Sequence, residues 1–352
     1  MGSVRFCFSA LAVMLVIATV APSTWAAKND LDLLHLCPMA ASSLASRVPE
    51  CSWVHRGPDG TIIGPVAPDL NGRKDFRSLM SELGVVLSPR MPMVAGTTGI
   101  AGFQLSAELG LMEISNNRRF WNGVAGVSEN NPAATRPDSR LTTVGGFVRK
   151  GIWLPVPTME LGFGAVHLLD SHLLAWQGYA KVALHEGSGR WTPALSVRWA
   201  LSYLTGTDQV NMTTTSFDFL ASKGFGLLKT ARMEPFVGGG LVAIFVHSKT
   251  IDGTPSCDAT RIAAGLDAGN PYCSPSQVRT KDDFKADFSF PDQNAITRYR
   301  VFAGLKIKFA VVFFAAQYEA FFAGSSADGN AASAKDQSGT QNALSLSAGL
   351  DF

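Results

Sequence analysis

The sequence predicts an all-β protein: a transmembrane, antiparallel, up-and-down β-barrel of about ten strands, preceded by a partly helical N-terminal segment. Two observations support this fold class. From residue 98 onward, apolar residues alternate with polar ones over short segments, a period that is typical of strands with one apolar face. Only 16% of the residues are charged, yet no segment beyond residue 26 offers eighteen uninterrupted apolar residues, so membrane-spanning helices are disfavoured.

The first 26 residues have the three parts of a secretory signal peptide. Arg5 supplies a short positive region, residues 6–20 form a continuous apolar run, and residues 24–26 make a small-x-small cleavage site. The alternative is a membrane anchor helix, but this run is shorter than the roughly 20 residues that span a bilayer. We therefore expect export and cleavage after Ala26.

Residues 27–97 differ from the rest of the chain. Residues 57–71 are rich in Pro and Gly and predict coil, whereas residues 75–87 place apolar side chains at helical spacing, with Gly84 as a weak point. We interpret this segment as a plug in the barrel lumen or a periplasmic cap. The alternative is that residues 79–90 form a barrel strand, which would give twelve strands. The predicted domains are a signal peptide (1–26), this segment (27–97) and the barrel (98–352).

Ten segments show the strand period and are separated by turn residues. They are 98–114, 141–154, 158–169, 172–186, 191–205, 211–222, 234–249, 297–308, 311–322 and 342–352. With the C-terminus in the periplasm, the connections 115–140, 250–293 and 323–340 fall outside the cell and are long, while those on the periplasmic side are short, as barrels require. The weakest connection is 309–310, which lacks a turn-favouring residue; one long strand is the alternative there.

Four cysteines remain after the signal peptide. Cys37 and Cys51 form one closely spaced pair, and Cys257 and Cys273 form another. This arrangement suggests disulfides within each pair, although four cysteines allow three connectivities. Metal binding is the competing idea, but no CxxC spacing exists, and we predict no metal site.

Several short motifs resemble known barrels. The last strand alternates apolar and polar residues and ends on Phe352, like the closing strand of Gram-negative outer-membrane barrels, where it is the assembly signal. Residues 300–306, followed by 316–318, resemble the last-but-one hairpin of small OmpW- and OmpA-like barrels, and residues 235–241 are similar to their recurrent Pro-aromatic-Val-Gly-x-Gly stretch. The resemblance covers about residues 234–352 and implies a fold, an outer-membrane location, and contact with lipid and the barrel-assembly machinery.

Twelve charged residues fall in the inward phase of the predicted strands. Four of them are Lys308, Glu160, Asp218 and Asp351. The eight that we take as lumen-lining candidates are Glu108, Arg149, Lys181, Arg198, Arg298, Arg300, Lys306 and Glu319. One interpretation is a network of internal ion pairs that fills a closed barrel, because isolated charges are costly to bury. The other is a water-filled constriction that favours small anionic solutes.

Catalytic motifs are not evident. Asp170, Ser171 and His172 are neighbours at a predicted turn, where they suit a tight hairpin better than a triad. We predict no enzyme and no cofactor, and the net charge of +2 does not favour a nucleic-acid partner.

The expected function is therefore porin-like passage of small solutes, or a structural barrel, by a monomer. The first alternative is a surface-binding or adhesin-type protein that acts through the loop at 250–292. The second alternative is an outer-membrane hydrolase.

Overall fold

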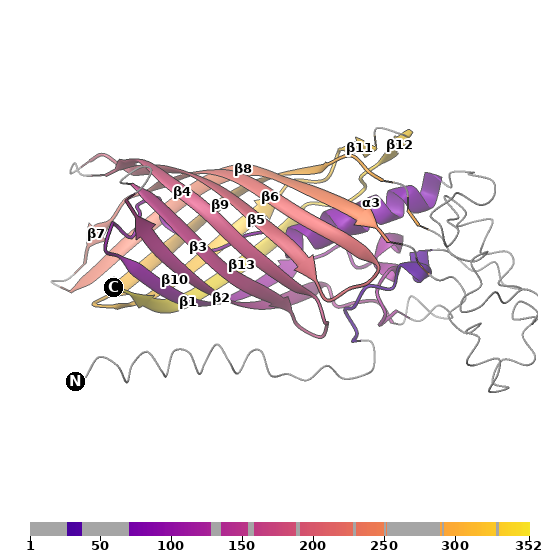
Figure 1. Ribbon diagram of the computed structural model, residues 1–352, viewed down its shortest axis with the longest axis horizontal. Coiled ribbons are helices and arrows are strands. Elements are labelled where there is room, and N and C mark those ends of the chain that lie inside the picture. Colours follow the sequence, from indigo (N-terminus) through magenta and orange to yellow (C-terminus); the bar gives the residue numbers. More distant parts are fainter. Residues whose placement is uncertain are drawn as a thin grey trace, which may run out of the picture.

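A computed structural model of the chain (Figure 1) describes residues 27–36, 70–127, 135–153, 158–187, 191–227, 230–249, 251, 289–290, 292–328 and 331–352. The expected signal peptide and all four candidate disulfide cysteines, Cys37, Cys51, Cys257 and Cys273, lie outside these residues. So do most of the expected loop at 250–292 and the expected turn at 155–157.

Ten long antiparallel strands form a closed barrel. They are β1 (Phe103–Glu113), β2 (Arg140–Ile152), β3 (Met159–Leu168), β4 (Leu174–Glu186), β5 (Ala194–Thr205), β6 (Val210–Ser222), β8 (Ala231–Ser248), β9 (Ile296–Phe309), β10 (Val312–Phe321) and β13 (Gln341–Asp351). Each strand pairs with its neighbour in sequence, β6 pairs with β8, and β1 pairs with β13 to close the ring. The predicted fold class is confirmed, and the alternative with twelve strands is wrong.

Short elements complete the fold. β7 (Phe225–Gly226) pairs with the start of β8, and β11 (Ala327–Asp328) pairs with β12 (Ala331–Lys335) in a separate two-stranded ribbon. The helical elements are η1 (Leu33–Leu36), α3 (Leu70–Val86) and η2 (Arg119–Asn122). Among the described residues, no helix combines the length and the apolar character needed to cross a membrane.

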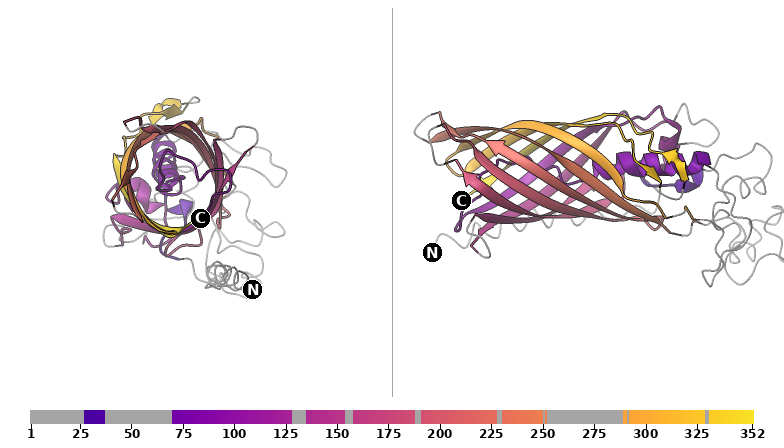
Figure 2. Two further views of the ribbon diagram at one scale, coloured as in Figure 1. Left: turned by 90° about the vertical axis from the view of Figure 1, so that its left-hand side faces the viewer. Right: turned by 90° about the horizontal axis from the view of Figure 1, so that it is seen from above.

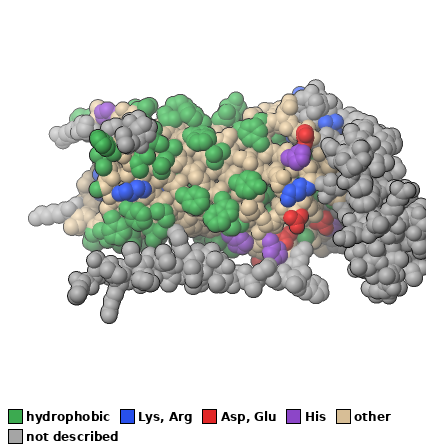
Figure 3. Space-filling view, in the orientation of Figure 1, with side chains coloured by type: hydrophobic (Ala, Val, Ile, Leu, Met, Phe, Trp, Pro, Cys, Tyr) green, Lys and Arg blue, Asp and Glu red, His purple; other side chains and the backbone are tan. Residues whose placement is uncertain are grey.

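The wall has a polar inner face and an apolar outer face. In β5, Ser196, Arg198 and Ser202 are buried, whereas the intervening Trp199 and Tyr203 are about half exposed. Large apolar side chains cover the outer wall in the space-filling view, and charged side chains gather toward one end (Figure 3). This alternation follows from the two-residue period of strands, because successive side chains point to opposite sides of the sheet.

The two ends of the barrel differ. Phe103 and Phe352 exchange backbone hydrogen bonds at one end, which we call the C-terminal end. The connections after β1, β8 and β10 lie at the opposite end, which we call the loop end, together with α3 (Figures 1 and 2). At the C-terminal end the connection between β9 and β10 is a turn of two residues, Ala310 and Val311, so the alternative of one long strand is wrong.

Helix α3 fills the mouth of the barrel at the loop end. Its apolar side chains join those of strands and loops in one buried cluster, which includes Leu79, Met80 and Leu83. Gly84 faces β8 so closely that a Cβ atom there would lie 2.6 Å from Ile244 Cδ1. A glycine inside the helix, which costs about 1 kcal/mol relative to alanine, thus permits the close approach of helix and wall.

Candidate functional site

The barrel lumen is occupied by the chain itself. After α3, residues 87–98, which we call the threaded segment, run from the loop end to the C-terminal end. At the start of the segment, the Leu87 carbonyl accepts hydrogen bonds from Gln177 Nε2 at 3.0 Å and Ser202 Oγ at 2.8 Å. At its other end, the Thr98 amide donates to Glu160 Oε2 at 2.9 Å. Because these partners lie on the inner face of the wall, the segment passes along the inside of the barrel.

Cationic side chains of the wall hold the backbone of the threaded segment. Three buried arginines and one buried lysine donate hydrogen bonds to its carbonyl oxygens between residues 89 and 96. The pairs are Arg300 with Pro89 at 2.9 Å, Arg198 with Met91 at 3.4 Å, Arg149 with Pro92 at 3.4 Å, and Lys181 with Val94 at 3.1 Å and Gly96 at 2.8 Å. An extended segment inside a barrel has no sheet partner for its carbonyls, so these side chains provide the hydrogen bonds that burial demands.

Carboxylates of the wall neutralise the same cations. Asp218 lies between two arginines and accepts from Arg198 Nη2 at 2.9 Å and from Arg300 Nε at 2.8 Å. Arg300 also contacts Glu319 at 3.3 Å. These four side chains are fully buried, and breaking such an arrangement leaves an uncompensated charge in a low-dielectric interior.

Two further pairs lie nearer the C-terminal end. Arg149 contacts Glu108 at 2.8 Å. Lys181 contacts Glu160 at 3.1 Å, and the Tyr179 hydroxyl donates to the same carboxylate at 2.7 Å. The charges along this part of the lumen are therefore matched pair by pair rather than gathered in a ring of one sign.

The helix and the loops are joined by polar contacts that the sequence pattern did not predict. Glu82 is fully buried, and its carboxylate accepts from Trp121 Nε1 at 2.7 Å and from the Ser115 amide at 2.9 Å. Arg77, also fully buried, donates to the carbonyls of Ser326 and Asn294 at 3.1 and 3.2 Å. These residues look like a solvated helix face in the sequence; they are buried because the helix is enclosed on all sides.

All eight candidate lumen residues make polar contacts inside the barrel. Six of them belong to the ion pairs described above, and the other two lie nearer the two ends. Arg298 lies at the loop end and donates to Ser81 Oγ of α3 at 2.9 Å and to Ser338 Oγ at 2.7 Å. Lys306 lies at the C-terminal end and contacts Asp351 at 2.7 Å, with Lys308 on the same carboxylate at 3.0 Å.

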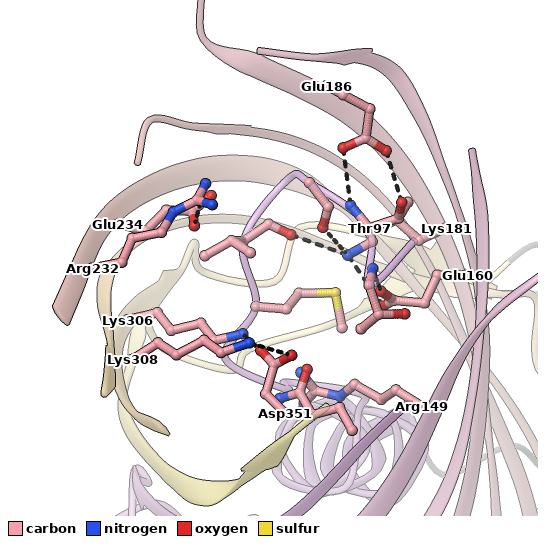
Figure 4. A pocket seen from close by; sticks show the side chains of 15 residues that line it. Thr97, Arg149, Glu160, Lys181, Glu186, Arg232, Glu234, Lys306, Lys308 and Asp351 are labelled. Carbon is pink, nitrogen blue, oxygen red and sulfur yellow. Dashed lines mark hydrogen bonds and ion pairs between the residues drawn. The ribbon is translucent and has the colours of Figure 1, made fainter. Parts of the chain in front are cut away.

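A cavity of about 270 Å³ remains at the C-terminal end (Figure 4). The threaded segment borders it through Met93, Val94 and residues 96–98. The wall residues that border it are Gln104, Arg149, Glu160, Lys181, Glu186, Arg232, Glu234, Lys306, Lys308 and Asp351. Polar side chains therefore dominate its lining.

The turn at Asp170, Ser171 and His172 is not assembled as a triad. Ser171 Oγ donates to the Leu168 carbonyl at 2.8 Å and accepts from the Leu173 amide at 3.0 Å, so it closes the hairpin. His172 instead contacts Asp30, whose carboxylate also accepts from the His172 amide at 2.6 Å. These contacts tie the N-terminal residues to the loop end.

Comparison with known proteins adds little to this description. No protein-family model matches the sequence, and no curated protein matches it. Among solved structures, the chain is similar to Ail, the attachment invasion locus protein of Yersinia pestis, with 10% identity and a TM-score of 0.25 over 72% of this chain and 99% of that one. It is also similar to the N-terminal β-barrel domain of Pseudomonas aeruginosa OprF, with 12% identity and a TM-score of 0.25 over 72% and 99% of the two chains. Because these TM-scores are low, the similarity carries no argument, and the barrel topology rests on the strand pairing alone.

Proposed function

We propose that this protein is a closed, non-conducting barrel of the bacterial outer membrane, which holds its N-terminal segment inside the lumen and at the loop end. Of the functions expected from the sequence, this is the structural barrel rather than the porin-like one. The observation that carries the proposal is the threaded segment, whose carbonyls are bound by buried cations of the wall from Pro89 to Gly96.

Membrane insertion is supported by the outer wall. Aromatic side chains such as Phe163, Trp176 and Phe314 are about half exposed there or more. A soluble protein rarely exposes a continuous apolar surface of this kind, whereas lipid requires it. The expected signal peptide and the terminal Phe352 favour the outer membrane as the bilayer in question.

The loop end carries the N-terminal residues. The Asn29 amide donates to the Asp170 carbonyl at 2.8 Å, and Leu31 pairs with Val124 in an isolated bridge. With the C-terminus in the periplasm, the loop end and these residues face outward. The barrel would then fix an N-terminal segment at the cell surface, with the threaded segment as its attachment.

Closure of the lumen is supported by the ion pairs as well. Cations that would line an anion-selective constriction are each engaged by a carboxylate or by a carbonyl of the threaded segment. Passive diffusion needs a continuous water-filled path, and the paired side chains and the threaded segment occupy that path beyond the cavity at the C-terminal end.

Single-channel recording in a planar bilayer tests this proposal. We expect the refolded barrel to give no discrete conductance steps. A variant that lacks residues 27–97 keeps all ten strands and should conduct, which would show that the assay detects an open lumen. Its folding is checked by heat-modifiable migration on a gel. Reproducible conductance of the unaltered protein would contradict the proposal.

A further inference from the structure

We propose that a groove on the outer wall binds one phospholipid, which lays an acyl chain on strand β4 and places its phosphate at Lys150. This rests on the proposed function in one respect, because the outer wall must face lipid. It goes beyond that function because it assigns one place on the wall to one lipid molecule.

The groove lies on the outer face of β2 to β5 and has a volume of about 480 Å³. These four strands are neighbours in the sheet (Figure 1). Large, exposed apolar side chains form its two sides, with Leu161 and Phe163 on β3 and Trp199 and Leu201 on β5. Because a group the size of a water molecule takes about 30 Å³, this volume accommodates a hydrocarbon chain.

Two small residues on β4 form the floor of the groove. Gly178 pairs with Phe163 on β3 and with Leu201 on β5. Ala180 lies two residues further along β4 and therefore points to the same face of the sheet. The groove thus arises where one strand with short side chains runs between two strands with long ones.

Packing of the wall does not require a glycine at position 178. A Cβ atom there would lie 3.8 Å from the Gly162 carbonyl oxygen and 3.9 Å from Phe163 Cδ2, which are ordinary van der Waals distances. At Gly162, by contrast, a Cβ atom would lie 2.0 Å from Tyr179 Cε1, so the fold itself requires that glycine. A strand glycine without a packing role often marks the close approach of a ligand, and Gly178 keeps the groove open to one.

Lys150 borders the groove and adds a positive charge to it. It is exposed and pairs with Phe103, so it lies at the C-terminal end of the barrel. Its ammonium group donates to the Ala101 carbonyl at 3.0 Å, and it forms no ion pair with the described residues. A lysine on a lipid-facing wall directs its ammonium group to the membrane surface, where lipid phosphates lie. The apolar groove and the cation beside it therefore match the two parts of a phospholipid.

Native mass spectrometry of the refolded barrel, released from detergent micelles, tests the groove with dipalmitoyl phosphatidylglycerol as the probe. We expect the first lipid to bind at least tenfold more tightly than the second. Gly178→Leu should weaken the first binding at least tenfold, because the new side chain fills the groove. Lys150→Met should weaken it about tenfold, because it removes a hydrogen bond to a charged group. Dipalmitoylglycerol, which lacks the phosphate, should bind without a preferred first site.

Each variant has a matched control. Ala316→Leu adds nearly the same bulk as Gly178→Leu at an exposed position of β10, outside the groove. Lys223→Met removes another lysine at the C-terminal end, which donates to the Thr192 carbonyl at 2.8 Å and does not border the groove. Both controls should leave the first binding unchanged, and all four variants are checked for folding by heat-modifiable migration.

Equal weakening by the groove variants and their controls would overturn the proposal, as would binding of dipalmitoylglycerol with the same affinity and preference. A dimer that Gly178→Leu dissociates would assign the groove to a second copy of this chain and would also overturn it. A barrel that neither conducts nor prefers one lipid refutes the groove and leaves the closed lumen intact. A barrel that conducts but keeps the preferred lipid refutes the closed lumen alone.

Discussion

Asp218→Asn removes the charge that compensates two buried guanidinium groups. The Asp218 carboxylate accepts from Arg198 at 3.0 and 2.9 Å, from Arg300 at 2.8 and 2.8 Å, and from Ser216 Oγ at 3.3 Å. In the variant, Arg300 still has Glu319 as a charged partner, whereas Arg198 still has the Met91 carbonyl, at 3.4 Å, as a hydrogen-bond acceptor. Because breaking a buried ion pair costs about 3–5 kcal/mol, we expect a loss of unfolding free energy toward the upper end of that range.

Equilibrium unfolding in guanidinium chloride, followed by tryptophan fluorescence of the barrel in lipid vesicles, measures this loss. The matched control is Asp138→Asn. Asp138 pairs with Lys28 at 2.8 Å, but the two side chains are 71% and 42% exposed, so we expect a change of about 0–1 kcal/mol. A loss for Asp218→Asn no larger than that of the control would refute the idea that Asp218 compensates the two buried arginines.

A second variant tests whether the loss of stability arises from the ion pair between Arg198 and Asp218. Arg198→Met combined with Asp218→Asn removes the pair rather than one partner, and replacing both members of a buried pair is often close to neutral. We therefore expect the double variant to recover part of the stability lost in Asp218→Asn. A double variant that loses the sum of the two single losses would show that the two side chains do not interact.

Three further outcomes are expected in the same unfolding assay. Ala310→Gly should stabilise the barrel by about 1 kcal/mol, since Ala310 adopts a left-handed φ of 51° that favours glycine; a loss would contradict this interpretation of the turn. Gly84→Ala should destabilise it by about 1–3 kcal/mol despite the better helix propensity, because the new methyl group meets Ile244; unchanged stability would show that the helix can shift. Glu82→Ala should cost about 2 kcal/mol or more, because Trp121 Nε1 and two backbone amides lose their acceptor, and a cost within measurement error would show that these donors find other partners.

The strands could be predicted because lipid and lumen impose opposite chemistry on alternate residues. The segment predicted at 191–205 corresponds to β5 (Ala194–Thr205), and the segment at 342–352 to β13 (Gln341–Asp351). The prediction failed at the start of β1, where alternation continues to residue 98 but the strand begins at Phe103. Gly99 there has a φ of 74°, and the Gly102 amide donates to its carbonyl at 3.1 Å, so the chain turns instead of pairing.

The occupied lumen could be predicted only in part. The inward phase of Arg149, Lys181 and Arg300 follows from the strand period, but their contact with carbonyls of the threaded segment does not, because any sequence offers backbone carbonyls. The helix predicted over 75–87 is found as α3 (Leu70–Val86). Its buried Glu82 was missed because amphipathic spacing assigns polar residues to solvent, whereas this helix has no solvent-facing side.

The course of the chain through the barrel has a mechanical consequence. From the loop end the chain descends as α3 and the threaded segment, reverses at residues 99–102, and climbs back as β1 within the wall. A force applied to the helix from the loop end would pull on this reversal and on a whole row of lumen hydrogen bonds at once, in shear. Since β1 is paired on both sides, by β2 and β13, the load would spread around the ring. The barrel would thus resist extraction of its own N-terminal part, and release of that part would require the barrel wall to open.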